Sequence, residues 1–288
     1  MTSDPVRAIA DAVLYEGYVL WPYRRSALKN QRRWTFGGVF PPAHTAAHPD
    51  DRCVMRAECL LEGDPADLDV TVRFLHIVRR DVEEGGDLVP WDEAAERELR
   101  PGAIDIPAGS ERDGAVVRSW EALAGTVDVG AEVVEPGVAR VTVEVANRTS
   151  WEGGDREEAL RRTFCSTHAV LRTSAGRFYS QADPPERLRA AADACRNDGV
   201  WPVLVDDDVV LCSPIILEDR PRIAPESPGD LFDGGEIDQL LALNILALTD
   251  EEKAQMRAAD PRTRAILERT EALTPEELLR LHGRTVRT

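Results

Sequence analysis

The sequence predicts an α+β fold: an antiparallel, sandwich-like β-rich core with an N-terminal helix and a C-terminal run of short helices. Strand-like alternation of apolar and polar residues recurs many times between residues 53 and 217, with glycine turns between the repeats. Beyond Gly229 the pattern changes to that of amphipathic helices. The glycine-rich nucleotide-binding motifs typical of many parallel α/β proteins are absent from the sequence.

The chain opens with a helix-start signal. In the Asp4-Pro5 pair a capping side chain precedes a proline suited to the first helical turn, so a short helix is expected to run to about Leu14. Residues 18–21 and 34–40 follow, and both are rich in aromatic and β-branched side chains. These two stretches predict short strands.

The central part of the chain predicts most of the sheet. Alternation is seen in residues 53–82, 116–145, 163–172, 201–205 and 209–217. With the two aromatic stretches, at least seven strands are expected, in an antiparallel arrangement. Two helices are expected to interrupt them, at residues 91–99 and 185–197.

The last sixty residues predict about four short helices. Capping boxes begin at Thr249 and Thr274, and the Asp260-Pro261 pair is another helix start. One helical face is shared by Ile237, Leu240, Leu241, Ile245 and Leu248. The expected organisation is a β-rich core domain over residues 1–228, with a helical segment over residues 229–288 packed on it.

Composition narrows the class of protein. No stretch approaches the roughly 20 apolar residues that cross a bilayer, and the acidic start of the chain lacks an export signal. The five cysteines are an odd number without a C-x-x-C pair, which favours reduced thiols in a cytoplasm. The net charge of −17 argues against a broad nucleic-acid surface. We therefore expect a cytoplasmic protein that neither inserts into membranes nor binds nucleic acid.

One segment carries positive charge in a chain whose net charge is strongly negative. Between Trp21 and His48 there are five cations and no carboxylate. Arginine forks bind carboxylates and phosphates, and aromatic rings beside them supply stacking faces. The alternative is that these arginines pair with the chain's own surplus carboxylates. The candidate ligand- or partner-binding residues of this cationic aromatic segment (residues 21–34) are Trp21, Tyr23, Arg24, Arg25, Lys29, Arg32, Arg33 and Trp34.

An acidic glycine-rich turn gives a candidate metal site. Five carboxylates crowd into residues 226–238, and hard divalent cations prefer several such oxygens on a loop. The spacing misses the calcium-loop pattern. Alternatively, Asp233 caps the helix that follows it. The candidate ligands to a divalent metal are Glu226, Asp230 and Asp233, together with His44 and His48.

Two further pairs of side chains have residue types suited to metal binding or catalysis. The His44-x-x-x-His48 spacing would aim two imidazoles at one ion from a helix, but Pro41, Pro42 and Pro49 bracket it, so exposed loop histidines are expected. Cys165 and His168 have the residue types of a nucleophile and its base. On a regular strand they would point to opposite faces and not meet.

Three stretches, residues 21–38, 183–202 and 213–253, resemble an uncharacterised family encoded with actinobacterial-type, aerobic hydrogen-oxidising nickel–iron hydrogenases. The most specific part is Ala-Pro-Glu-Ser-Pro-Gly-Asp-Leu-Phe-Asp-Gly at 224–234. The resemblance implies a setting of hydrogenase assembly, maturation or support, with hydrogenase subunits or other maturation proteins as partners. It implies no catalytic residue. The zinc-binding cysteine pairs of nickel chaperones and the phosphate loop of their GTPase partners are absent from this sequence.

These features predict a non-catalytic accessory protein for a nickel–iron hydrogenase, which binds an acidic partner or anionic ligand through the cationic aromatic segment. One alternative is a metal-dependent enzyme or metal carrier that uses the acidic turn. Another is an enzyme or binder of a small organic anion, with Tyr23, Arg24, Arg25, Lys29 and Arg32 lining the pocket.

Overall fold

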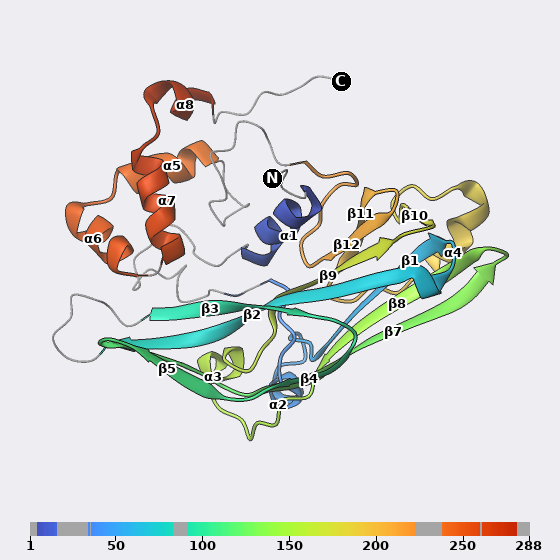
Figure 1. Cartoon of the computed structure of the whole chain (residues 1–288), viewed down its shortest axis with the longest axis horizontal. Helices are drawn as coiled ribbons and strands as arrows, with labels where there is room; N and C mark the ends of the chain where they lie inside the picture. The colour runs from blue at the N-terminus through green and yellow to red at the C-terminus, as the bar shows by residue number, and fades with distance from the viewer. Residues whose placement is uncertain are drawn as a thin grey trace.

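Two antiparallel sheets stacked face to face form the centre of the molecule (Figure 1). The structure is a computed structural model that describes residues 5–15, 34, 36–82, 91–222, 238–259 and 261–280. Its strands are β1 (Val54–Glu62), β2 (Leu68–Val82), β3 (Trp91–Leu99), β4 (Gly102–Ile106), β5 (Gly109–Asp113), β6 (Val116–Trp120), β7 (Leu123–Glu135), β8 (Val138–Asn147), β9 (Cys165–Thr173), β10 (Arg177–Tyr179), β11 (Trp201–Asp206) and β12 (Val209–Ser213).

Helices lie before, between and after the strands. The α-helices are α1 (Pro5–Tyr15), α2 (Pro42–Ala47), α3 (Arg156–Leu160), α4 (Arg189–Asp193), α5 (Asp238–Leu246), α6 (Asp250–Ala258), α7 (Pro261–Glu271) and α8 (Pro275–Arg280). Two 3-10 turns are η2 (Pro65–Asp67) and η3 (Glu186–Leu188). No helix in these described ranges is both long enough and apolar enough to cross a bilayer.

One sheet has five strands in the order β10-β1-β8-β7-β4, and the other has seven, β11-β12-β9-β2-β6-β5 with β3 also paired to β2. The 15-residue strand β2 organises the larger sheet. β3 pairs with residues 72–80 of β2, β9 with residues 68–75 and β6 with residues 79–82. Because a strand has two edges, these overlaps put β3 on one edge and both β9 and β6 on the other.

The main core fills the space between the sheets. Alternate residues of β8 face Val72 and Phe74 of β2 across this space, and all are fully buried. The ring of Phe74 stacks on that of Phe164, with centroids 4.7 Å apart. Gly125 of β7 lies under Phe164, where a Cβ would collide with the carbonyl oxygen of Ala146, so the close approach of these strands requires glycine.

A second core covers the outer face of the seven-stranded sheet. Leu75 and Ile77 of β2 share one hydrophobic cluster with the end of α1 and with the C-terminal helices. Figure 1 shows these helices gathered near α1 on that side of the sheet. The helices contribute seven residues to this cluster: Leu14, Tyr15, Leu241, Ile245, Met256, Ile266 and Leu267. The predicted α+β class, with an N-terminal helix and a run of short C-terminal helices on a β-rich core, is confirmed.

The predicted capping boxes are confirmed, whereas two predicted elements are shorter than expected. The capping boxes at Thr249 and Thr274 form, each with reciprocal hydrogen bonds to the glutamate three residues on. The predicted strand at residues 209–217 ends at Ser213, before Pro214, and the predicted helix at 185–197 is a 3-10 turn followed by α4, which ends at Asp193. Residues 18–21 and the proposed domain boundary after residue 228 lie outside the described residues, so both stay predictions.

The helix expected at residues 91–99 is wrong, because this stretch is strand β3. Its alanine, glutamate and leucine content is typical of helices, but the ladder to β2 over nine residue pairs overrides that preference. Its carboxylates also meet arginines of neighbouring strands: Glu93 pairs with Arg80 and Arg118, and Glu98 with Arg73.

The strand expected at residues 34–40 is also wrong in detail. Trp34 and Gly37 have φ values of +63° and +55°, which interrupt an extended conformation. Residues 36–39 still pair loosely with the start of β9, and Val39 forms an isolated antiparallel bridge with Phe164.

Candidate functional site

Of the cationic aromatic segment, only its C-terminal residue, Trp34, is among the described residues. Trp34 is 4% exposed and packs with Leu14, Tyr15 and Phe40 in the second core. The expectation that its ring faces a ligand is therefore corrected, because burial in the core hides that ring. The other seven candidates, at residues 21–33, lie outside the described residues, and their role stays a prediction.

The chain just after the segment is anchored to β9. The Phe36 carbonyl accepts from the Ser166 N–H at 3.1 Å, and the Gly37 carbonyl accepts from the Thr167 N–H at 2.9 Å. Gly37 has positive φ, and a Cβ there would lie 2.8 Å from the Cβ of Pro214. This junction fixes the place on the fold where the segment ends.

A β-bulge in β9 corrects the geometry expected for Cys165 and His168. His168 lies opposite Arg73 and Cys165 opposite Leu75, so three steps on β9 match two on β2. Arg73 and Leu75 share a face of β2, so Cys165 and His168 share a face as well. The extra residue lies beside Ser166, whose φ is +53°. The prediction of opposite faces was wrong because a bulge changes the alternation by one residue.

His168 and two of the cysteine thiols are held in their neutral forms. Burial, with the nearby charges of Arg73 and Arg7, lowers the pKa of His168 to about 4, and its Nδ1 lies 3.1 Å from the Ser166 carbonyl. Burial also raises the pKa of Cys195 to about 11 and that of Cys212 to about 12. Groups with these values are poorly matched to acid–base or thiolate chemistry near pH 7.

His44 and His48 lie at helix α2, not in a loop. Pro42 occupies the first turn, where proline needs no N–H partner, so the prolines delimit the helix rather than forbid it. His44 is 3% exposed, its Nε2 lies 2.9 Å from Asp51 Oδ2, and its ring stacks on Phe40. The expectation of exposure is confirmed for His48 and wrong for His44.

Only two of the proposed metal ligands, His44 and His48, are among the described residues. Among the described residues, no group of three or more His, Cys, Asp or Glu side chains is arranged to hold a metal ion. Glu226, Asp230 and Asp233 lie outside those residues. A divalent metal held by the acidic turn therefore stays a prediction, while Nε2 of His44 already contacts Asp51.

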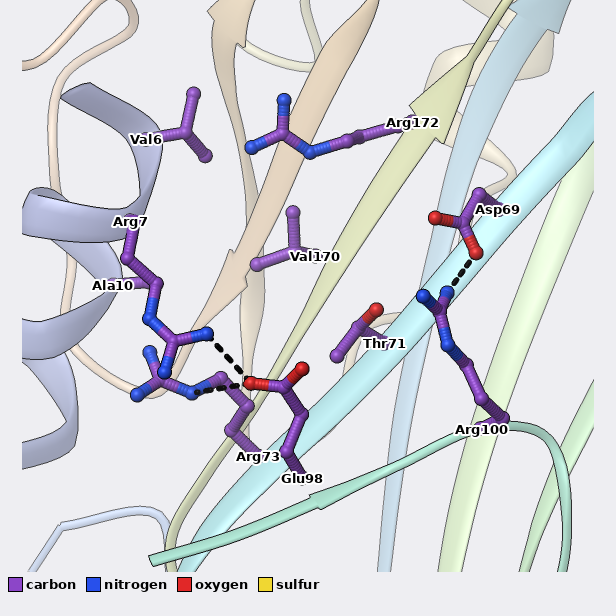
Figure 2. A pocket seen from close by; sticks show the side chains of 10 residues that line it. All are labelled: Val6, Arg7, Ala10, Asp69, Thr71, Arg73, Glu98, Arg100, Val170 and Arg172. Atoms are coloured by element: carbon purple, nitrogen blue, oxygen red, sulfur yellow. Dashed lines mark hydrogen bonds and ion pairs between the residues drawn. The ribbon is translucent and has the colours of Figure 1, made fainter. Parts of the chain in front are cut away.

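A pocket that the sequence did not reveal lies between α1 and the outer face of the seven-stranded sheet. It has a volume of about 200 Å³, and Figure 2 labels its ten lining residues. Strands β2, β3 and β9 contribute alternate residues that project from one face, and the N-terminal half of α1 closes the side. The charged lining residues are Arg7, Asp69, Arg73, Glu98, Arg100 and Arg172.

Arg73 is the centre of an ionic network beside this pocket. It is 2% exposed, its Nη2 lies 2.6 Å from Asp11 Oδ1, and its Nε lies 3.6 Å from Glu98 Oε2. The same Glu98 oxygen accepts from Arg7 Nη1 at 2.6 Å, and Arg100 pairs with Asp69 (Figure 2). The Nη1 atom of Arg73 is buried without a hydrogen-bond partner.

The network extends to α7 through Glu96. This carboxylate accepts from Tyr15 Oη at 2.5 Å, from Arg262 at 2.9 Å and from Arg73 at 3.3 Å. Although burial acts in the opposite direction, these donors hold the pKa of Glu96 below its usual value. The guanidinium of Arg262 also lies 4.2 Å from the centre of the Tyr15 ring. Helices α1 and α7 are thereby tied to β3 through one carboxylate.

Comparison of the sequence with models of protein families and with curated proteins finds no match. The resemblance to the hydrogenase-associated family therefore stays a prediction.

Proposed function

We propose that this chain is a cytoplasmic, non-catalytic accessory protein for the assembly or support of a nickel–iron hydrogenase. In this proposal the cationic aromatic segment binds an acidic surface of a hydrogenase subunit or of another maturation protein. The observation that carries it is the charge inversion between Trp21 and His48, where five cations and no carboxylate occur in a chain of net charge −17.

The use of arginine elsewhere in the chain supports this proposal. Many arginines of the described strands pair with carboxylates of the same chain, as Arg118 does with Glu93 at 2.7 Å and Arg177 with Glu62 at 2.5 Å. With 52 acidic residues against 35 basic ones, such internal pairing is the expected fate of a cation here. A run of cations without a neighbouring carboxylate in sequence is the exception, and complementary charge guides association with an acidic partner.

The anchoring of the segment's C-terminal end also favours binding. Trp34 is held in the second core, and residues 36–39 are hydrogen-bonded to β9. A binding element with one fixed end loses less conformational freedom when it engages a partner.

Co-purification tests the proposal. A tagged chain is expressed in cells that produce the hydrogenase, and the recovered proteins are quantified by mass spectrometry. The test variant replaces Arg24, Arg25, Arg32 and Arg33 with glutamine. The matched control replaces four exposed arginines that pair within the fold, Arg79, Arg177, Arg189 and Arg220. Both variants lose four positive charges, so both change the formal net charge from −17 to −21.

We expect the native chain and the control variant to recover hydrogenase subunits or maturation proteins, and the test variant to lose them. Equal recovery by the two variants would show that the segment is not the binding element. No enrichment with the native chain would contradict the accessory function itself.

A further inference from the structure

We infer that the open edge of β7, residues 129–133, pairs antiparallel with the same residues of a second copy of the chain, so that two copies share one continuous sheet. The inference uses none of the residues of the cationic aromatic segment and does not depend on the function proposed above. Three features of β7 carry it: an unpaired main chain, an exposed apolar row, and a sequence that complements itself.

The main chain of β7 is unpaired on one side beyond Val127. β4 pairs with residues 123–127 and β8 with residues 125–135, and no other described strand pairs with β7 (Figure 1). The carbonyl of Ala124 accepts from the N–H of Arg148, at the end of β8, at 2.8 Å. Because the direction alternates along a strand, even-numbered residues of β7 bond toward β8. The main-chain groups of residues 129, 131 and 133 therefore point to the open edge.

The same three residues present an apolar row to solvent. Side chains alternate along a strand, so Val129, Ala131 and Val133 project from the same face as Val127, which belongs to the main core. The residues opposite them on β8 are at most 2% exposed. Val129 is nevertheless 38% exposed and Val133 74% exposed. A strand added along this edge would cover the row and extend the main core.

The sequence of this edge complements itself. With Ala131 on the two-fold axis, antiparallel pairing puts Val129 opposite Val133 of the second copy on the apolar face. Both are hydrogen-bonded pairs, and each such pair exchanges two main-chain bonds. On the other face Glu132 lies opposite Gly130 of the second copy, where a Cβ would meet nothing within 4 Å. No two like charges are directly opposite, and Glu132 is already paired with Arg140 at 2.5 Å.

Other edges of the described sheets are protected, whereas this one is not. Proteins protect sheet edges with prolines, lysines, inward-pointing charges or a covering segment. β4 has only five residues, between Pro101 and Pro107. Residues 219–220 cover β11, where the N–H of Arg220 donates to the Leu204 carbonyl at 2.6 Å. Residues 129–133 contain neither proline nor lysine, and their one charged side chain lies on the face away from the core. A second copy is the partner that satisfies this edge and its apolar row together.

Sedimentation equilibrium of the full chain tests the inference. Concentrations should run from low micromolar to several hundred micromolar, because an interface of one strand pair is small. We expect the average mass to rise with concentration from 31.8 kDa toward twice that value. Higher ionic strength should strengthen the association, because two chains of net charge −17 repel each other. A monomer at every concentration and ionic strength would overturn the inference.

A pair of proline variants locates the interface. Ala131→Pro removes an N–H that faces the open edge and leaves the bonds to β8 in place. Ala103→Pro is its matched control, because Ala103 is an exposed residue of β4 whose position opposite Thr126 also turns its N–H away from β7. We expect Ala131→Pro to be monomeric at all concentrations and Ala103→Pro to associate like the native chain. Equal association of the two variants would place the interface elsewhere and contradict the assignment.

Cross-linking provides a second route should Ala131→Pro fail to fold. Residue 131 meets its own copy on the axis, at a Cα–Cα distance of about 5.5 Å that a disulfide can span. With diamide as the oxidant, Ala131→Cys should therefore form covalent dimers much faster than Ala103→Cys or the native chain, whose free Cys53 and Cys195 are only partly exposed. Cross-linking of Ala131→Cys no faster than that of Ala103→Cys would show that the two edges do not meet in this register.

Discussion

The free energy of unfolding should fall by about 4 kcal/mol between pH 7.5 and pH 5.0, because two buried histidines are neutral in the fold. Burial lowers the pKa of His168 to about 4, with smaller contributions from Arg73 and Arg7. Burial and the charge of Arg97 likewise lower the pKa of His76 to about 4. At pH values between the unfolded pKa of about 6.5 and these folded pKa values, the unfolded chain binds more protons than the folded chain. The stability of the fold therefore falls as the pH falls. Each histidine contributes ~2 kcal/mol over this interval.

Urea unfolding at pH 7.5 and at pH 5.0 measures this difference. Glu58, Glu62 and Glu96, whose pKa values are lowered in the fold from an ordinary 4.5, are still mostly ionised in the unfolded chain at pH 5.0, so they add only a smaller loss in the same direction. His168→Gln is expected to lose about half of the pH dependence, whereas the exposed His48→Gln should keep all of it. Equal stability of the native chain at the two pH values would show that these imidazoles are accessible to protons in the folded protein.

Truncation of Phe164 should strongly destabilise the core, by about 3–5 kcal/mol for Phe164→Ala. The side chain is fully buried between the sheets, stacks on Phe74 and lies directly over Gly125. Its backbone also pairs with Val39, next to the bulge in β9. The ring therefore holds together both sheets and the start of β9, and its loss leaves a cavity that the rigid strands cannot close.

Chemical denaturation of Phe164→Ala and of Phe36→Ala tests this effect. Phe36 is a matched control, because it lies on the stretch that pairs with β9 but is 38% exposed. We expect the control to lose less than about 1 kcal/mol. Similar losses in the two variants would mean that the space between the sheets is not the main core.

Much of the fold could be predicted because its signals are local. Alternation along β1, β2 and β8, and the capping boxes of the C-terminal helices, depend on neighbouring residues. β3 could not be recognised, because residues 91–99 prefer helix and only pairing with β2 makes them extended. The strands β4, β5 and β10 are too short for a clear alternation of apolar and polar residues. The bulge at Ser166 depends on register with a strand ninety residues away.

The arginine-lined pocket could not be predicted from the sequence. Its residues come from α1, β2, the β3 region and β9, which are distant along the chain. In the sequence, Arg73 is an ordinary polar residue of an alternating strand, and burial with an unpaired Nη1 is a property of the folded state. The only local signal is the spacing by two that puts Asp69, Thr71 and Arg73 on one face. The cationic aromatic segment was visible because it is contiguous.

The most direct test of the functional account is the reactivity of its arginines toward phenylglyoxal, resolved by peptide mass spectrometry. If the segment is reserved for a partner, Arg24, Arg25, Arg32 and Arg33 should be modified faster than the buried Arg73 and Arg80 and at least as fast as the exposed Arg177. Addition of the co-purifying partner should then protect them. Modification as slow as that of Arg73, with no change on adding the partner, would mean that these cations are neutralised within the chain, which contradicts the account.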